Sequence, residues 1–445
     1  MSTQTAQTSS QGSGQRTRSC AVGLACHRCE NRYPLDSTVF ACPDCGKGLD
    51  IEYDYELAAR HFKDIPAAQR PQNIWHFEEL LPIVDASAQA RVGRHSGFTP
   101  LIRAERLGAE LGIANLYLKD DSTSRPSLSY KDRVVSMSVA RLLERGKSEI
   151  GCVSTGNVGT AVASLAAKAG VDAYVFYPNR LEDMKARSCM ALGAKVCQVE
   201  GNYDEANRRC RELAEATGMD FANITLRPFY AEGAKTAAFE IVEELDWRAP
   251  EHIVTAAAGG TLSSRLHKGL GELQLLGLAE TDATRIHIAQ PSGCNPIAAA
   301  ILAEEAEVHA VTPETAAHSL AIGAPGDGYL VVDAVRKRGG TGAFASDPEI
   351  FAGIDLLAAS EGLLTEPAGG TTVAVLEKLA AAGRFAPGDT VVAIITGNGL
   401  KTLDEHPAKP WPAKIDCELD AMLAALGELK AGGSLIDSAR EQLHV

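Results

Sequence analysis

The sequence predicts an α/β fold with two lobes, each a mostly parallel sheet flanked by helices, preceded by a small metal-binding ribbon. Two stretches of the chain alternate short strands with helices, which is typical of parallel sheets covered on both faces. Near the N-terminus, four cysteines in a C-x2-C-x12-C-x2-C arrangement indicate the ribbon. A chain of 445 residues is long enough for this organisation, at roughly 150 residues per domain.

The composition is that of a soluble globular protein and argues against two classes of partner. Apolar residues make up 45% of the chain and charged residues 22%, and the net charge of −14 disfavours binding to nucleic acid or to an anionic membrane. No apolar run approaches the roughly 18 residues of a membrane span. Residues 1–20 are polar and lack the apolar core of a signal peptide, so we expect a disordered tail.

The eleven cysteines fall into two groups. Seven are scattered and odd in number, which without a signal peptide favours a reduced, cytoplasmic protein. The other four are the ribbon cysteines Cys26, Cys29, Cys42 and Cys45. They can wrap one zinc ion tetrahedrally at Zn–S distances of about 2.3 Å. Two disulfides or chance spacing are the alternatives. Because all four ligands come from the protein, we expect a closed, structural site.

Strands and helices alternate along the rest of the chain. Residues 53–85 are expected to be mostly helical, with four buried side chains: Trp75, Phe77, Leu80 and Leu81. The first run has expected strands at 116–121, 150–154, 173–177 and 195–199, and expected helices at 134–145, 158–169 and 181–192. The second has expected strands at 253–257, 286–289 and 390–395, and expected helices at 231–245, 263–270, 296–303, 353–361 and 371–382. A last helix is expected at 419–429.

Lys131 is the first candidate for chemistry. It lies in the stretch PSLSYKDR (residues 126–133) and precedes apolar residues at helical spacing, so we expect it at the start of a helix. The positive end of a helix helps to keep an amine neutral and can hold an anion. A neutral amine is what Schiff-base formation needs. A solvated surface lysine beside Asp132 is the alternative.

Three glycine-rich stretches follow expected strands and precede helices. They are STGNVG (154–159), AAAGGTL (256–262) and TGNGLK (396–401). Ligands of open α/β sheets bind beyond the carboxyl ends of the strands, so we expect the three stretches to meet at one site. Small residues at 257–260 permit close approach of backbone N–H groups to one phosphate, and Thr261 adds a hydroxyl. The alternatives are a tight packing turn for AAAGGTL and a helix cap for Asn157.

A lysine, a cradle for one phosphate and a crevice of ring size are typical of a pyridoxal phosphate site. The stretches SYKDR, STGNVG, AAAGGTL and TGNGLK also occur in the order and spacing of the threonine synthase family. The chain resembles that family from about residue 26 to about residue 404, including the ribbon that some members carry. The resemblance implies the tryptophan-synthase-β-like fold and pyridoxal phosphate as cofactor.

The resemblance also implies a role for each residue that matches a family motif. Lys131 looks like the Schiff-base lysine and proton shuttle. Asn157 would contact the cofactor's phenolic oxygen and Thr396 its pyridine nitrogen, where a neutral hydroxyl suits elimination and replacement chemistry. The phosphate cradle would be the backbone of Ala257, Ala258, Gly259, Gly260 and Thr261. Ser154 and Thr155 resemble the pair that holds the substrate carboxylate.

Three positions depart from the family pattern. Arg125 and Leu128 stand where the family motif N-P-T-G-S-F-K-D-R has asparagine and glycine. Tyr230 matches the arginine that grips the substrate phosphate in the family's N-P-x-R-x-E-G run. A phenol recognises an anion less well than a bidentate guanidinium. Either Arg125 or Arg227 compensates, or the substrate is not O-phosphohomoserine.

We therefore expect a lyase of threonine synthase type, which converts O-phosphohomoserine and water to threonine and phosphate. The alternatives are β-replacement on O-phosphoserine, as in a cysteate synthase, elimination on another amino acid, and a non-catalytic ligand-binding homologue. The expected organisation is a tail (1–20), a zinc ribbon (21–52), a large cofactor-binding lobe (53–130 and 226–445) and a small mobile lobe (131–225). We expect a homodimer with a small-molecule amino-acid substrate and no nucleic-acid or membrane partner.

Overall fold

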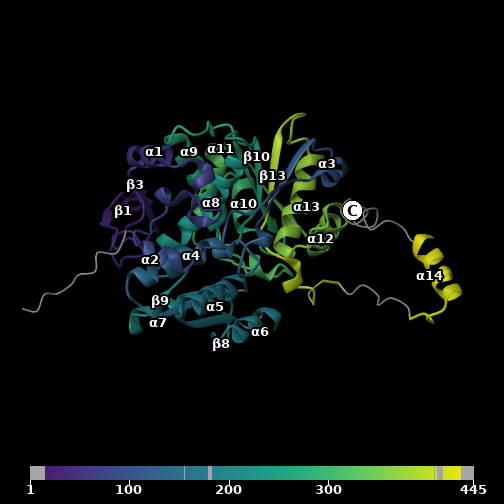
Figure 1. Ribbon diagram of the computed structural model, residues 1–445, viewed down its shortest axis with the longest axis horizontal. Helices are drawn as coiled ribbons and strands as arrows, with labels where there is room; N and C mark the ends of the chain where they lie inside the picture. The colour runs from purple at the N-terminus through teal and green to yellow at the C-terminus, as the bar shows by residue number, and fades with distance from the viewer. Residues whose placement is uncertain (1–15, 155, 179–182, 405, 408–413, 432–445) are drawn as a thin grey trace, which may run out of the picture.

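The computed structural model describes residues 16–154, 156–178, 183–404, 406–407 and 414–431 (Figure 1). The chain forms one three-stranded sheet, one six-stranded sheet and one four-stranded sheet. The two larger sheets are flanked by helices, and the expected α/β class with an N-terminal ribbon is confirmed. Figure 1 shows the ribbon, drawn in purple, at one end of the molecule.

The ribbon is an antiparallel sheet in the order β2-β1-β3, formed by β1 (Ala21–Cys26), β2 (Arg32–Pro34) and β3 (Leu49–Tyr53). Alternate residues of β3 are buried, as expected for a strand with one solvated face. The sequence predicted a disordered tail over residues 1–20, but the last five of these residues are ordered. Residues 16–20 hydrogen-bond to residues 79–84, with the Cys20 N–H 2.9 Å from the Glu79 carbonyl oxygen. Residues 1–15 of the expected tail lie outside the described residues.

The six-stranded sheet has the order β12-β11-β10-β13-β5-β4, and only the pair β4–β5 is antiparallel. Its strands are β4 (Leu101–Arg103), β5 (Asn115–Asp120), β10 (His252–Ala256), β11 (Arg285–Pro291), β12 (Gly342–Ala345) and β13 (Thr390–Ile395). In β13, Val392 and Ile394 join one apolar core, and Val391 and Ala393 join the other. Both faces of the sheet are therefore buried, which explains why its strands read as continuous apolar runs.

Helices cover the two faces of this sheet. Those that pack directly on its strands are α3 (Glu105–Leu111), α9 (Thr261–Leu275), α10 (Pro296–Leu302), α11 (Gly328–Arg338) and α13 (Pro367–Ala381). Helix α8 (Arg227–Glu244) packs on α9, and α12 (Asp347–Glu361) packs on α13. Helix α1 (Tyr55–Asp64) contacts the segment 74–80, and α2 (Ala86–Arg91) contacts the helix Lys131–Glu144. Within the stretch 53–85, α1 is followed by two 3₁₀ turns, and the four side chains expected to be buried there are buried.

The four-stranded sheet is all parallel, in the order β8-β7-β6-β9. Its strands are β6 (Glu149–Val153), β7 (Asp172–Pro178), β8 (Lys195–Val199) and β9 (Asp220–Phe221), and its helices are α4 (Lys131–Glu144), α5 (Asn157–Ala169), α6 (Asp183–Ala191) and α7 (Tyr203–Thr217). Helix α4 packs against both α5 and α8, so it joins this smaller lobe to the six-stranded one.

The sequence did not predict α7, α11 or β12. Helix α7 buries three small residues at helical spacing, Ala206, Cys210 and Ala214, and no large apolar side chain marks its buried face in the sequence. A capping box formed by Asn202 and Glu205 marks its start instead. The expected C-terminal helix is α14 (Leu419–Ala431), which Figure 1 shows standing away from the two lobes. Within the described residues, no helix combines the length and the apolar character needed to cross a membrane.

Candidate active site

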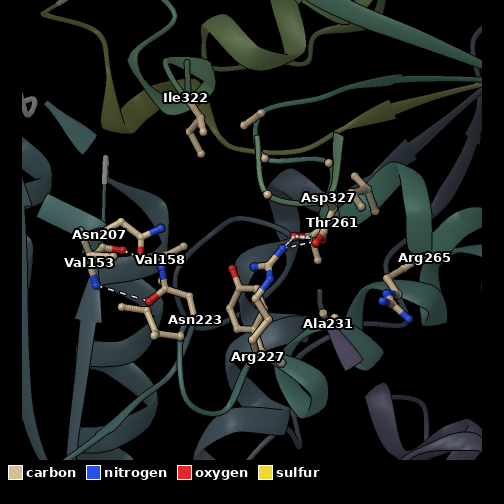
Figure 2. A pocket seen from close by; sticks show the side chains of 18 of the residues that line it. Val153, Val158, Asn207, Asn223, Arg227, Ala231, Thr261, Arg265, Ile322 and Asp327 are labelled. Carbon is tan, nitrogen blue, oxygen red and sulfur yellow. Dashed lines mark hydrogen bonds and ion pairs between the residues drawn. The ribbon is translucent and has the colours of Figure 1, made fainter. Parts of the chain in front are cut away.

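A cavity of about 350 Å³ lies where the carboxyl ends of β6 and β10, the start of α4 and the ribbon meet. Figure 2 shows Asn207 and Asn223 on one side of it, and Arg227, Thr261 and Asp327 on the other. The cavity brings together most of the residues that the sequence singled out. Those that line it are Lys131, Ser154, Asn157, Arg227, Tyr230, Ala257, Ala258, Gly259, Gly260 and Thr261.

Lys131 is the first residue of α4, so it lies at a helix start as expected. The preceding residue is anchored to the large sheet, because the Tyr130 N–H donates to the carbonyl oxygen of Thr396 at 2.9 Å. The Lys131 ammonium donates to the Tyr130 hydroxyl and lies 4.2 Å from the centre of its ring. Burial raises the pKa of Tyr130 above its ordinary value, so the hydroxyl stays protonated.

The stretch 257–261 connects β10 to α9 and presents the N-terminus of α9 to the cavity. No side chain caps this helix end, so its first N–H groups remain available to an anion. A Cβ atom at Gly259 would be in ordinary contact with Ile322 at 3.7 Å, whereas Gly260 has φ +94° and a Cβ there would lie 2.9 Å from Val331. Glycine is therefore required at 260 by conformation and by space.

Arg227 lies beside this cradle. Its guanidinium donates to the Thr261 hydroxyl at 2.8 Å and forms an ion pair with Asp327, as the dashed lines in Figure 2 show. Asp327 also accepts from Thr261 at 3.2 Å. The charge of Arg227 is thus matched by a carboxylate at the edge of the cradle and is not directed at the open part of the cavity.

Asn157 is the first residue of α5 and does not cap it, since the N-cap position is Gly156. Its amide nitrogen donates to both carboxylate oxygens of Glu366, at 2.7 and 2.8 Å, and its amide oxygen accepts from Lys401 at 2.8 Å. Lys185 lies 3.6 Å from Glu366. Burial alone would raise the pKa of Glu366, but Lys185 and Lys401 lower it below its ordinary value.

The sequence interpretation missed the roles of Glu366, Lys185 and Lys401. They come from three separate segments, and all three contact or approach Asn157 or its loop. A Cβ atom at Gly156, which has φ +142°, would lie 2.6 Å from Lys185 Cδ. Of these three residues, only Lys401 lies in a stretch that the sequence analysis singled out, TGNGLK. No motif in the sequence indicates that Glu366 or Lys185 lies near Asn157.

Ser154 and Thr396 flank the site at the ends of their strands. The buried Ser154 hydroxyl accepts the N–H groups of Gly156 and Gly159 at 2.9 and 2.8 Å, so its own proton remains to be donated. Thr396 is buried directly after β13 and contacts the Lys131 segment through its backbone. It is not among the described residues that line the cavity. Thr155 lies outside the described residues.

The structure separates the residues considered for the substrate phosphate. Tyr230 is buried in the cavity wall, and burial raises its pKa, so it offers a neutral hydroxyl near Lys131. Arg125 is exposed and does not line this cavity; it lies on a second cavity with Arg94, His95 and Lys168. Its proposed role as a substitute clamp is therefore not supported by its position.

The four ribbon cysteines form one cluster whose sulfur atoms all lie within 4.8 Å of one another. Their Sγ atoms are 3.4 Å apart in the pairs Cys26–Cys45 and Cys29–Cys42, and 3.7 Å apart in Cys29–Cys45. A tetrahedron with Zn–S bonds of about 2.3 Å has edges of about 3.8 Å. All four are free thiols, so the arrangement is compatible with a zinc ribbon and not with two disulfides.

The donor set also fits pyridoxal phosphate. One uncapped helix N-terminus lines the cavity and can bind a single phosphate, and the amine of Lys131 opens into the same cavity. This combination of one phosphate cradle and one lysine amine is what a lysine-bound cofactor requires.

Comparison with known proteins gives the family. Residues 92–397 match the family described as pyridoxal-phosphate dependent enzyme. Threonine synthase of Methanocaldococcus jannaschii is 33% identical over 407 residues, covering 91% of this chain and 99% of the relative. Threonine synthase of Methanosarcina acetivorans is 32% identical over 409 residues, covering 91% and 98%.

Solved structures share the fold. Diaminopropionate ammonia lyase from Escherichia coli is similar with a TM-score of 0.61 at 18% identity, covering 86% of this chain and 95% of that chain. O-ureido-L-serine synthase is similar with a TM-score of 0.59 at 22% identity, covering 76% and 98%. The fold and the site together define a pyridoxal phosphate-dependent enzyme, a lyase. Within that class, the chain belongs to the threonine synthase family, as its sequence motifs indicated.

Proposed function

We propose that this enzyme converts O-phosphohomoserine and water to threonine and phosphate, in amino-acid biosynthesis. One observation carries the proposal. In a chain similar over 91% of its length to an enzyme named threonine synthase, Lys131 opens into the same cavity as the uncapped N-terminus of α9. That pairing provides one amine and one phosphate cradle at the centre of the site.

In this proposal, pyridoxal phosphate is held by Lys131, by the backbone of residues 257–261, by Asn157 and by Thr396. When bound, it supplies a sink for electrons left on a substrate carbon after proton removal. The Lys131 amine, freed by the substrate amine, takes and returns protons. The Tyr130 hydroxyl, protonated because burial raises its pKa, can donate to that amine and keep it in place. Ser154 donates its free proton to the substrate carboxylate, with Thr155 as its partner.

We also propose that the four ribbon cysteines bind one structural Zn²⁺. The support is the number of thiols, their spacing in the chain and the distances between their sulfur atoms. A reducing compartment, the cytoplasm, is part of the proposal, because all eleven cysteines are free thiols. A homodimer, and movement of the small lobe (131–225) over the cavity, remain predictions of the family resemblance.

A second candidate, β-replacement on O-phosphoserine or elimination on another amino acid, is favoured by one observation. Tyr230, buried and neutral, occupies the wall of the cavity where the family motif has arginine. A shorter or unphosphorylated substrate needs less anion recognition at that position.

The test is product analysis with the purified holoenzyme. O-phosphohomoserine, O-phosphoserine, serine and threonine are supplied separately, and phosphate release and amino-acid products are measured. The proposal requires phosphate and threonine in equal amounts from O-phosphohomoserine. Faster turnover of O-phosphoserine or serine would select the second candidate, and no turnover of any substrate by protein that binds the cofactor would refute both.

A further inference from the structure

The ribbon forms part of the wall of the active-site cavity. The loop between β2 and β3 contributes Phe40, Ala41, Lys47 and Gly48 to the lining. His27, which lies between the first two cysteines, is 3.0 Å through its Nδ1 from the hydroxyl of Tyr329, another lining residue. The ribbon was expected to be purely structural, but its packing places it directly on the substrate side of the site.

Helix α7 of the small lobe lines the cavity beside the ribbon. Tyr203, Asn207 and Arg211 are spaced by four residues, so they share one helix face, and all three line the cavity. The Arg211 guanidinium lies 5.3 Å from the ring centre of Phe40 in the ribbon. The ribbon and α7 therefore contact each other through Phe40 and Arg211. Figure 2 shows Asn207 of α7 on the opposite side of the cavity from Thr261.

Some of the positively charged side chains that line the cavity form ion pairs with carboxylates, and others do not. Arg227 pairs with Asp327, and Arg265 pairs with Asp50 and Glu232. Within the described part of the chain, neither Lys47 nor Arg211 has an ion pair; each instead lies against an aromatic ring, Tyr329 and Phe40 respectively. Apart from Lys131, the lysine and arginine residues that line the cavity without an ion pair, among the described residues, are therefore Lys47 in the ribbon and Arg211 in α7.

We propose that Lys47 and Arg211 form the subsite for the distal phosphate of the substrate. This inference rests on the proposed function, because it assigns the phosphate of that substrate. Tyr230 is buried and neutral, and Arg227 is matched by Asp327, so neither supplies free positive charge. Lys47 and Arg211 do supply free positive charge to the cavity. Lys47 belongs to the ribbon and Arg211 to the small lobe.

The subsite links substrate recognition to the ribbon and to the small lobe. Lys47 follows Cys45 by two residues, so the metal that orders the cysteine cluster also fixes the start of the Lys47 side chain. Arg211 is carried by α7, which packs on the four-stranded sheet. A substrate phosphate bound by both would hold these two units together over the cavity.

The experiment compares Lys47→Gln and Arg211→Gln holoenzymes with matched controls. The controls are Arg28→Gln, which also lies two residues after a ribbon cysteine, and Arg209→Gln, an exposed residue of α7 paired with Glu212. We expect each cavity variant to raise KM for O-phosphohomoserine about tenfold or more, with kcat changed much less, since a charge-assisted contact contributes about one to two decades. The cofactor absorbance band and the control variants should be unchanged, and Arg211→Lys should recover part of the loss.

A second readout does not depend on turnover. Inorganic phosphate is titrated into each holoenzyme, and its dissociation constant is measured by calorimetry. Weaker phosphate binding in Lys47→Gln and Arg211→Gln, but not in the controls, supports the subsite even if O-phosphohomoserine is not the substrate and the proposed function fails. If O-phosphohomoserine is turned over and both KM and phosphate affinity stay within about twofold of wild type in the cavity variants, the subsite is refuted while the proposed function stands.

Discussion

At the scale of single residues, the position of Lys131 gives the first prediction. Replacing it by alanine should remove the covalent attachment of the cofactor and lower turnover by at least about a hundredfold, because the only other described lysine that lines the cavity is Lys47 of the ribbon. Loss of the visible absorbance band of the bound cofactor is the measurement. Lys195→Ala, an exposed lysine of β8, serves as control.

Borohydride reduction followed by peptide mapping tests the same assignment in the native enzyme. The label is expected on the peptide that contains Lys131. Label on any other lysine would contradict the assignment of Lys131. It would also contradict the proposal that the Tyr130 hydroxyl holds the reactive amine.

Leu128 gives a second prediction at this scale. It has φ +57°, a left-handed conformation that costs a residue with a Cβ atom roughly 1–2 kcal/mol and glycine almost nothing. Its carbonyl oxygen accepts from Lys401 at 3.0 Å, which keeps the backbone in this conformation. Leu128→Gly should therefore be more stable than Leu128→Ala by about 1 kcal/mol, the reverse of the usual order.

Urea unfolding midpoints measure this difference. The matched control is Leu143, a half-buried residue within α4, where glycine should be less stable than alanine by about 1 kcal/mol. If alanine is the better substitute at both positions, the strain assigned to Leu128 is not present.

At the scale of elements, the ribbon gives the third prediction. Purified, reduced protein should contain about one zinc ion per chain, and removing it with a chelator should lower the unfolding temperature, because the ribbon then loses the metal–thiolate bonds that link its two pairs of cysteines. Chelation should also raise KM for O-phosphohomoserine, since Lys47 lies in the second cysteine turn.

Metal analysis of Cys42→Ser distinguishes this site from adventitious binding. That variant should lose the zinc, whereas Cys197→Ser, an exposed cysteine outside the ribbon, should retain it. A metal content near zero in wild-type protein would remove the basis for a zinc ribbon.

At the scale of the whole molecule, two histidines in the six-stranded sheet predict the pH dependence of stability. His252 and His287 are buried, and their ring nitrogens lie 2.9 Å apart. Burial, with His252 nearby, lowers the pKa of His287 to about 3. In the unfolded chain its pKa is about 6.5, so below that pH the unfolded state binds a proton that the folded state does not.

Stability from this group is therefore complete above about pH 6.5 and is lost as the pH falls. The loss should be about 2 kcal/mol of unfolding free energy between pH 6.5 and pH 5. Denaturant unfolding at several pH values measures it, and His287→Gln should show a smaller slope than wild type. Equal slopes for the two proteins would mean that His287 is not held neutral.

The sequence by itself determined the class of the fold, the family and the composition of the central site. Strand–helix alternation is a local pattern that can be recognised in the sequence. The glycine-rich turns can be interpreted locally as well, because only small residues let a backbone approach a phosphate at a helix N-terminus. The same holds for the cysteine pairs, whose spacing is set by the geometry of one metal ion. These features lie within short stretches, so they can be read without knowing what packs against them.

The tertiary structure alone decided which charges face the substrate. Arg125, six residues before Lys131, opens onto a different cavity, while Lys47 and Arg211 both line the active-site cavity although they are more than 150 residues apart in the chain. Whether Arg227 is free or matched depends on Asp327, 100 residues away. The physical reason is that a charge acts over a few ångströms in space, and that distance is set by packing of helices and sheets, which no local spacing of residues records.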